Sequence, residues 1–346
     1  MMGDGMNQSE VDDIIGEWGL RAIGIAVPEA GTMNEVYLVT TVSGRVVFRG
    51  HRRRDRRRVE LEHEVMAHAR GMGLPVPATI PTPGGDLVVE RGGRYFSLFE
   101  HARGRHVPRV RLGEAHAKAM GRTLGALHRA LRSFRPADAP RAQHHRDVPA
   151  VLRRIDVLLD RVDTIEHPEA EDHWARERLA TRATWLQEHV DLPSPTGDET
   201  QMVHGDYQDS NLFFGQGEVS GIIDWDKAEL RAPGEEVVRA MHLSLKLDVG
   251  LCQAFLAAYR PIADLPSRQL DQAVATYSHD RACDLWLYET IYQDGDDRPR
   301  RFITPGRFTP FIDQWAEVSS LIDASGPAGQ HRGRERQVFD HRRPHN

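Results

Sequence analysis

The hydrophobic positions of this chain change their period near residue 100. Before it they alternate with polar residues in short runs, which is typical of strands with one buried face. Beyond Leu112 they recur every three or four positions, the period of helices that pack on one side. The pattern predicts a strand-rich part followed by a larger helical part.

Within the strand-rich part, alternation and turn residues place the individual elements. A leader over residues 1–20 carries a short amphipathic helix, whose buried face is Val11, Ile14, Ile15 and Trp18. The remaining predictions are strands on both sides of a turn at 29–34, a return strand over 45–49, a helix over 59–70, and a hairpin joining 86–90 to 94–99.

The helical part is predicted to end in a flexible tail. Its helices are expected over 115–131, 151–159, 174–189, 251–259 and 269–288, with another that begins at 235–240. Residues 326–346 are rich in Gly, His and Arg without any period, so they are expected to be flexible.

Composition narrows the function classes. Of 346 residues, 40% are hydrophobic and 28% are charged, as in soluble globular proteins. No run approaches the roughly 18 apolar residues that a membrane span requires, so a cytoplasmic protein without a membrane partner is expected. Cys252 and Cys283 are expected to be buried, reduced thiols. The oligomeric state is left open.

Charge argues against a nucleic-acid partner. The formal net charge is −6 at pH 7. A basic run at 51–58 has no aromatic residues interleaved with it, so it is interpreted as a solvated loop that enters a helix. Only three of the 45 Lys and Arg residues are lysines, at positions 118, 227 and 246.

The stretch from Val203 to Asp226 carries the clearest chemical signal. It contains His-Gly-Asp, an Asn five positions after the Asp, a hairpin over 212–223, and Ile-Ile-Asp-Trp-Asp. Such a hairpin brings Asn211 and Asp224 about 5 Å apart at its open end, close enough to share a hard cation. Asp206 lies beside them, where it can act on a hydroxyl group. A base and two metal ligands in this order are typical of a kinase-type phosphotransfer site.

H-G-D-x-x-x-x-N followed by I-I-D-W resembles the aminoglycoside phosphotransferase family, which includes choline kinases and type II homoserine kinases. The resemblance implies an α+β, two-lobed protein-kinase-like fold, with a small antiparallel-sheet N-lobe and a larger, mainly helical C-lobe. It also implies ATP and Mg²⁺ as cofactors. Asp206 would be the catalytic base, and Asn211 and Asp224 would be the metal ligands.

The same resemblance assigns the nucleotide side of the site. A loop over the phosphates would use Gly31, Thr32 and Asn34. No lysine precedes Lys118, so Arg49 is expected to replace the lysine that usually contacts the phosphates. Glu64 is expected to orient Arg49, with Glu60 as its competitor.

The resemblance also divides the chain. The backbone of Phe99, Glu100 and His101 would bind the adenine edge in a hinge over residues 99–104. A nucleotide-binding lobe over 21–98 would precede this hinge, and a catalytic and substrate lobe over 105–325 would follow it. In the second lobe a carboxylate commonly anchors the catalytic loop, and Glu235 and Glu236 both remain open for that role.

The acceptor is the part that the sequence leaves least defined. Carboxylates near aromatic residues are candidates for binding an amine of the substrate, namely Asp226, Glu289, Asp294, Asp296 and Asp297. The expected function is transfer of the γ-phosphoryl group of ATP to a hydroxyl of an aminoglycoside, another antibiotic sugar, homoserine or a choline-like alcohol. A non-catalytic nucleotide-binding pseudokinase and a protein kinase are the alternatives, and ATP or GTP preference is open.

Two motif-like stretches are rejected. His63-Glu64 is followed by His68, one residue too far for the zinc pattern H-E-x-x-H, so the two imidazoles point to different sides of a helix. His145-Arg146-Asp147 imitates a kinase catalytic loop, but Leu152 stands where the Asn is required.

Overall fold

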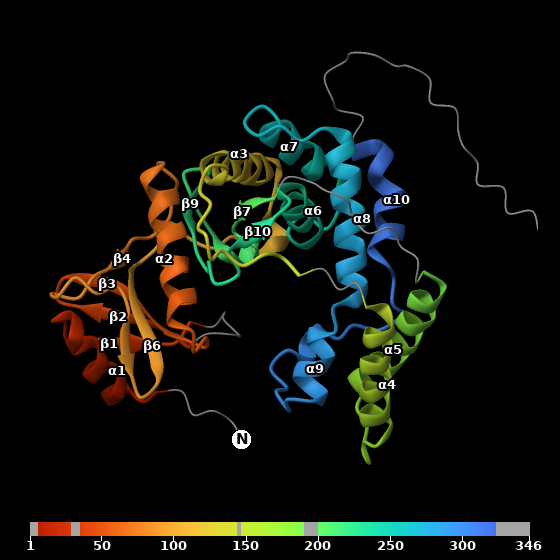
Figure 1. Cartoon of the computed structure of the whole chain (residues 1–346), viewed down its shortest axis with the longest axis horizontal. Coiled ribbons are helices and arrows are strands. Elements are labelled where there is room, and N and C mark those ends of the chain that lie inside the picture. The colour runs from red at the N-terminus through yellow and green to blue at the C-terminus, as the bar shows by residue number, and fades with distance from the viewer. Residues whose placement is uncertain (1–5, 29–34, 144–146, 190–199, 323–346) are drawn as a thin grey trace, which may run out of the picture.

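The computed structural model describes residues 6–28, 35–143, 147–189 and 200–322. Its first part, the sheet lobe (residues 24–100), is built on one antiparallel sheet (Figure 1). Alternating hydrophobic residues of its central strands, among them Phe48, Phe96 and Leu98, are buried. The strands run in the order β1 (Gly24–Ala26), β2 (Glu35–Thr41), β3 (Gly44–His51), β6 (Arg94–Glu100) and β4 (Thr79–Ile80), and β5 (Val89–Arg91) also pairs with β6.

The leader packs on this sheet. It contains α1 (Gln8–Ile15) and a 3-10 turn η1 (Gly16–Trp18), and the four hydrophobic residues predicted to share a face are all buried. They join one core cluster with the central strands. The capping box between Asn7 and Glu10 fixes the start of α1.

Helix α2 (Arg56–Gly71) connects the two parts of the protein. Its hydrophobic side enters the same core cluster as α3, in the helical lobe (residues 105–322). The prediction that the basic run at 51–58 is only solvated is wrong, because two of its arginines bond residues of the helical lobe. Arg58 donates to the backbone carbonyl of Asp226 at 3.2 Å, and Arg57 bonds Asp138 at 2.9 Å through Nη2. Both partners lie in the helical lobe, so the run links the lobes.

The helical lobe is centred on α3 (Glu114–Leu131), which crosses α7 (Val249–Tyr259) at close range. Gly121 makes this approach possible, because a Cβ there would lie 2.2 Å from the carbonyl oxygen of Phe255. The next elements of this core are α6 (Pro233–Leu243), α8 (Ser267–Cys283) and α10 (Phe311–Ile322).

A second core lies farther from the sheet lobe (Figure 1). It is formed by α4 (Val148–Asp163), α5 (Ala170–Glu188) and α9 (Trp286–Tyr292), with the end of α8. The single helix predicted over 269–288 is wrong, because α8 and α9 are separate. Asp284 leaves the helical region with ψ of 107°, and its carboxylate accepts the amide proton of Trp286, which starts the next helix.

Two short antiparallel pairs lie at the centre of the molecule. Strand β7 (Gln201–Val203) pairs with β10 (Glu229–Arg231), and β8 (Leu212–Gly215) pairs with β9 (Glu218–Ile222). The predicted hairpin over 212–223 is thus confirmed, preceded by the 3-10 turn η3 (Asp209–Asn211). Two further 3-10 turns are η2 (Arg109–Arg111) and η4 (Arg300–Phe302).

Other expectations concern membrane spans, thiols and the tail. No helix within the described ranges is long and apolar enough to span a membrane. Cys252 and Cys283 are buried free thiols, as predicted. The predicted tail over 326–346 and the catalytic-loop imitation at 145–146 lie outside the described residues.

Candidate active site

A buried carboxylate holds the turn before Asp206. Glu236 of α6 accepts the amide proton of Gly205 on Oε1 at 2.6 Å, and that of His204 on Oε2 at 3.3 Å. Nε2 of His128 lies 2.9 Å from the same Oε2. Burial opposes ionisation, but the contact with His128 and the backbone amide bond together hold the pKa of Glu236 below its ordinary value. The anchor is therefore a carboxylate.

The structure decides between the two anchors that the sequence left open. Glu235 pairs with Arg231 at 2.6 Å, whereas Glu236 accepts hydrogen bonds from the amides of His204 and Gly205. Neighbouring residues on a helix point about 100° apart, so only one of the two can face the turn.

Two neighbours set the backbone of Asp206. Gly205 has φ of +81°, and a Cβ there would lie 2.1 Å from the carbonyl oxygen of Lys227, so no side chain fits. His204 accepts the amide proton of Asp206 on Nδ1 at 3.2 Å, which places its own proton on Nε2. That Nε2 donates to the carbonyl of Ile223 at 2.9 Å, next to Asp224. One imidazole therefore ties the predicted base to the predicted metal ligand.

Two cations flank the carboxylate of Asp206, which is 5% exposed. Oδ2 accepts from Nζ of Lys227 at 3.0 Å, and Oδ1 accepts from Nε of Arg239 at 3.2 Å and from its Nη2. Burial alone would raise the pKa of Asp206, but these two charges lower it to about 2. Asp206 is ionised at neutral pH and can accept a hydrogen bond from a hydroxyl group.

Sequence reasoning missed both of these cations. Lys227 carried a usable signal, because it directly follows the Ile-Ile-Asp-Trp-Asp motif in a chain with only three lysines. Arg239 lies 33 residues from Asp206 on α6, and no local pattern points to the contact.

Asn211 and Asp224 lie at the open end of the β8–β9 hairpin, as predicted. The amide of Ile223 donates to the carbonyl of Asn211 at 3.0 Å, which brings the two positions side by side. Nδ2 of Asn211 donates to the backbone carbonyl of Asp206 at 2.9 Å, so Oδ1 is the atom of this amide that is left to face a ligand.

Asp224 is held in a strained conformation with φ of +65°. Its Oδ1 accepts from Nη2 of Arg49 at 3.1 Å. Burial raises the pKa of Asp224, and the carboxylates of Asp226 and Asp206 raise it further against the effect of Arg49. A buried carboxylate among other carboxylates is one that a bound cation would stabilise.

The prediction that Glu64 orients Arg49 is wrong. Nη1 of Arg49 donates to Oε1 of Glu62 at 2.7 Å, and both side chains are buried, at 8% and 4% exposure. Glu64 and Glu60 pair instead with the exposed Arg57 and Arg56 on the same helix. Positions 62 and 64 are about 200° apart around α2, so only the first faces the sheet.

The other predicted nucleotide contacts are only partly described. Phe99 and Glu100 lie at the end of β6, and the amide of Glu100 already donates to the carbonyl of Ala78 at 2.9 Å. That amide is therefore not available to an adenine ring, and His101 directly follows the strand. Gly31, Thr32 and Asn34 lie outside the described residues.

Most of the acids predicted to bind an amine are already paired with arginines. Three of the four in α9 and after it are paired: Glu289 with Arg154, Asp296 with Arg298, and Asp297 with Arg300. The backbone amide of Asp294 donates to the carbonyl of Glu289 at 3.0 Å. Asp226 lies elsewhere, 3.7 Å from Arg49.

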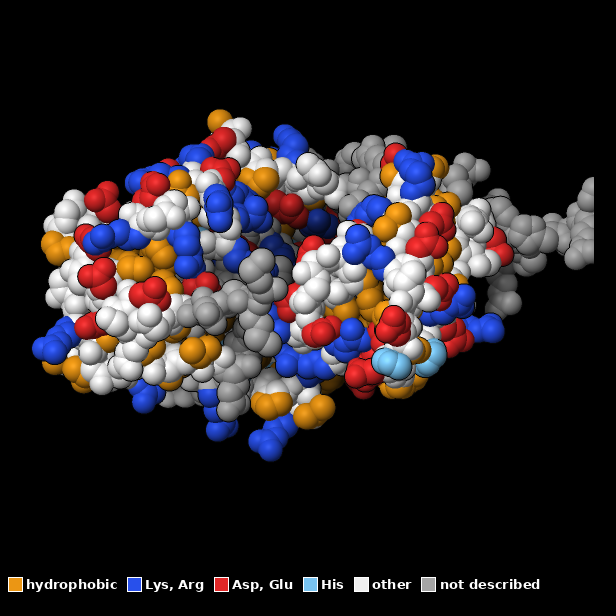
Figure 2. All heavy atoms as spheres, turned by 90° about the horizontal axis from the view of Figure 1, so that it is seen from below, with side chains coloured by type: hydrophobic (Ala, Val, Ile, Leu, Met, Phe, Trp, Pro, Cys, Tyr) orange, Lys and Arg blue, Asp and Glu red, His pale blue; other side chains and the backbone are white. Residues whose placement is uncertain are grey.

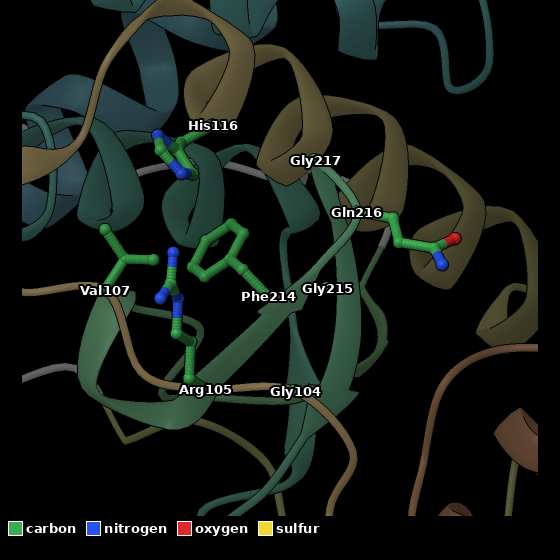
Figure 3. A pocket seen from close by; sticks show the side chains of 8 residues that line it. All are labelled: Gly104, Arg105, Val107, His116, Phe214, Gly215, Gln216 and Gly217. Carbon is green, nitrogen blue, oxygen red and sulfur yellow. The ribbon is translucent and has the colours of Figure 1, made fainter.

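A cavity of about 340 Å³ lies beside the β8–β9 hairpin (Figure 3). The side chains of Arg105, Val107, His116 and Phe214 surround it, and Gly104 and the turn at 215–217 complete its lining. It contains none of the predicted site residues, so it is distinct from the place where Asp206, Asn211 and Asp224 meet.

The family model of the phosphotransferase enzyme family (APH) matches residues 24–270, which include every element of this site. The chain belongs to this family. Asp206, Asn211 and Asp224 all lie within the matched residues.

Curated relatives match a shorter part of the chain. A homoserine kinase of Chelativorans sp. (strain BNC1) is 29% identical over 197 residues, which is 56% of this chain and 56% of that protein. A homoserine kinase of Agrobacterium fabrum is 27% identical over 162 residues, covering 46% of this chain and 45% of that protein. The match thus spans about half the length of these relatives.

Solved structures with the same fold are more distant in sequence. The amicoumacin kinase hAmiN, in complex with AMP-PNP, Ca²⁺ and Ami, has a TM-score of 0.59 at 17% identity, over 89% of this chain and 97% of that chain. A microcompartment-associated aminopropanol kinase has a TM-score of 0.59 at 17% identity, over 91% and 99%. These likenesses confirm the predicted α+β, two-lobed kinase-like fold.

Proposed function

We propose that this protein is a small-molecule kinase that transfers the γ-phosphoryl group of ATP to a hydroxyl group. The observation that carries the proposal is the ionised Asp206 beside Asn211 and Asp224. Its amide donates to Nδ1 of His204, whose Nε2 donates to the carbonyl of Ile223, and its carbonyl accepts from Nδ2 of Asn211. Phosphoryl transfer depends mainly on positioning and on neutralising charge, so a few fixed groups are sufficient.

In the proposed step the acceptor oxygen forms a bond to the γ-phosphorus, and the bond from that phosphorus to the β–γ bridging oxygen breaks. ADP leaves with the electron pair. Because the pKa of Asp206 is about 2, this carboxylate is a weak base. It orients the hydroxyl first and accepts the proton late, when the new O–P bond has made that proton acidic, and then passes it to water.

Arg49 is suited to the nucleotide phosphates. Its guanidinium is held by Glu62 and Asp224, and its Nε is buried without a hydrogen-bond partner among the described residues. A buried donor without a partner is uncommon, and a phosphate oxygen would satisfy it.

The oxygen donors fit Mg²⁺. Asp224 offers a carboxylate and Asn211 an amide oxygen, the ligand types that this hard cation prefers. No group of three or more His, Cys, Asp or Glu side chains in the described ranges could hold a metal alone, so phosphate oxygens and water would complete the shell. When bound, Mg²⁺ would neutralise charge on the phosphates.

The two alternative functions have less support. A protein kinase needs a segment that docks a peptide, but only residues 225–232 separate Asp224 from α6, and Trp225 and Ala228 within them are each 1% exposed. A non-catalytic nucleotide-binding protein would not need Asp206 with both its oxygens held in place.

The proposal is tested by nucleotide turnover with ATP or GTP, Mg²⁺ and a panel of hydroxylated acceptors. Relatives named for homoserine, aminopropanol and amicoumacin define the first members of that panel. We expect acceptor-dependent ADP release that falls at least about 1,000-fold in Asp206→Asn, since the oriented base is lost. Asp163→Asn removes a carboxylate from an exposed ion pair on α4 and is the matched control. Turnover that is equal in both variants would refute the assignment of Asp206.

A further inference from the structure

The cavity of about 340 Å³ beside the β8–β9 hairpin takes no part in the proposed reaction. Its volume lies within the roughly 300–1,000 Å³ that is usual for small-molecule sites. Successive residues of a strand point to opposite faces, so Phe214 lines this cavity while Phe213 packs on His106, with their ring centres 4.0 Å apart. We call this space the hairpin cavity and treat it as a second site.

The walls of the hairpin cavity are mostly apolar and already in place. Phe214 is 4% exposed, and its ring meets the imidazole of His116 edge-on at 5.1 Å. In Figure 3 the side chains of Arg105, Val107, His116 and Phe214 point toward one another, whereas Gln216 points away. The amide of Arg105 donates to the carbonyl of Phe214 at 3.0 Å, and the amide of Phe214 donates to the carbonyl of Arg105 at 2.8 Å. These two bonds hold opposite walls at a fixed separation.

Two hydrogen-bond donors face this apolar lining. The guanidinium of Arg105 makes no hydrogen bond or ion pair to any residue within the described ranges. Nδ1 of His116 accepts the amide proton of Gly113 at 3.2 Å, so the neutral ring carries its proton on Nε2. His116 also lies in the first turn of α3, and Gly113 at its N-cap has no side chain to cap the helix, so this end adds partial positive charge.

The positive charge at the hairpin cavity is not balanced by the nearby acids. The two acids closest in sequence to the lining are Glu114 and Glu218, and both pair with other cations. Glu114 pairs with Lys118 at 2.5 Å, and Glu218 pairs with Arg122 at 2.6 Å. The charge of Arg105 therefore favours an anionic ligand and disfavours an amine.

We propose that the hairpin cavity binds a small organic carboxylate with a flat apolar body, and that the guanidinium of Arg105 receives the carboxylate. The planar fork of a guanidinium matches the two oxygens of a carboxylate. The apolar body lies against Phe214 and Val107, and Nε2 of His116 supplies a further donor. The inference does not depend on the kinase proposal, because none of these residues takes part in the proposed transfer.

The first test titrates the full-length protein with three probes by isothermal titration calorimetry. Benzoate has a ring and a charge, benzamide has nearly the same shape without the charge, and acetate has the charge without the ring. We expect Kd for benzoate to be at least about tenfold lower than Kd for benzamide, the effect of a charged hydrogen bond, and also lower than Kd for acetate. Benzamide or acetate binding as tightly as benzoate, or no benzoate binding at about 10 mM, would overturn the inference.

The second test locates the carboxylate. Arg105→Gln should raise Kd for benzoate at least about tenfold, because the neutral amide cannot replace the charged fork. Arg103→Gln is the matched control, since Arg103 is an exposed arginine of the same segment that does not line the cavity. A Kd within twofold of wild type in Arg105→Gln, or an equal rise in both variants, would show that benzoate binds elsewhere.

Other cations also attract carboxylates, so a third test closes the cavity without changing its charge. Figure 2 shows Lys and Arg side chains around the hollow between the two lobes, where Lys227 and Arg239 contact Asp206. Val107→Phe fills the hairpin cavity and leaves that hollow unchanged, so it should abolish benzoate binding. Val110→Phe, at a position that is 93% exposed and outside the lining, should keep it.

Urea unfolding of both phenylalanine variants shows whether each is folded. Wild-type affinity for benzoate in folded Val107→Phe would overturn the inference. If Val107→Phe does not fold, the comparison of Arg105→Gln with Arg103→Gln decides where benzoate binds, since both of these arginines are exposed.

Discussion

Alanine substitution of two glutamates on α2 tests how Arg49 is held. Glu62 is buried and lies 2.7 Å from Arg49, while Glu64 is exposed and pairs with Arg57. Both positions lie inside the same helix, so the change in helix propensity is the same for the two variants. A difference between them therefore reports the surroundings of the two side chains.

The expected magnitudes differ severalfold. Removing one partner of a buried ion pair costs about 3–5 kcal/mol, and we expect about 3 kcal/mol for Glu62→Ala because Asp224 and Asp226 still face Arg49 at 3.1 and 3.7 Å. An exposed pair contributes about 0–1 kcal/mol, which is the limit for Glu64→Ala. Since Arg49 also loses its orientation, KM for ATP should rise roughly tenfold in Glu62→Ala only.

The measurements are urea unfolding and steady-state kinetics at pH 8. This pH is chosen because burial raises the pKa of Glu62 to about 7, although Arg49 lowers it in turn, so the carboxylate is ionised there. Equal losses of stability in the two variants, or a larger effect of Glu64→Ala on ATP, would show that Arg49 is not held by Glu62.

Two further predictions concern the catalytic turn and the response to acid. Gly205→Ala should lose at least about 2 kcal/mol of stability and most activity, because its Cβ would meet the carbonyl of Lys227, whereas Gly217→Ala, at similar φ in open space, should lose about 1–2 kcal/mol and keep kcat. Burial, with Arg49 nearby, lowers the pKa of His63 to about 4, whereas an unfolded histidine titrates near 6.5. The unfolded chain therefore binds the extra proton between pH 6.5 and 4, and the free energy of unfolding falls as the pH falls through that window. In His63→Phe this slope should be shallower by up to about 1.4 kcal/mol per pH unit, and identical slopes in urea unfolding would contradict the explanation.

The arrangement of the candidate site could be predicted from the sequence because its geometry is local. Asp206, Asn211 and Asp224 lie on one turn and one hairpin, and turn residues at 215–217 define the pairing that brings the last two together. For the carboxylate that supports this turn, the sequence left two candidates, Glu235 and Glu236. They are adjacent in one helix, and only tertiary packing determines which of them faces the turn.

Contacts between distant elements could not be predicted in this way. The sequence did not show that Glu62, rather than Glu64, faces Arg49. Helix α2 carries charged residues on several faces, including the buried one, so the pattern of polar residues does not identify its inner side. Arg239 reaches Asp206 only because α6 packs under the catalytic turn. The break at Asp284 was missed because hydrophobic spacing continues across it, and a local side-chain bond to Trp286 separates the helices.

The hydrogen bonds of His204 have a consequence for how new specificities can arise. The imidazole joins the amide of Asp206 to the carbonyl of Ile223. These bonds fix the two ends of the segment 204–223 relative to each other without a contact from any other part of the chain. Substitutions elsewhere in the chain leave these two bonds in place. Such substitutions can therefore change the surroundings of Asp206, while its position relative to Asp224 is inherited intact.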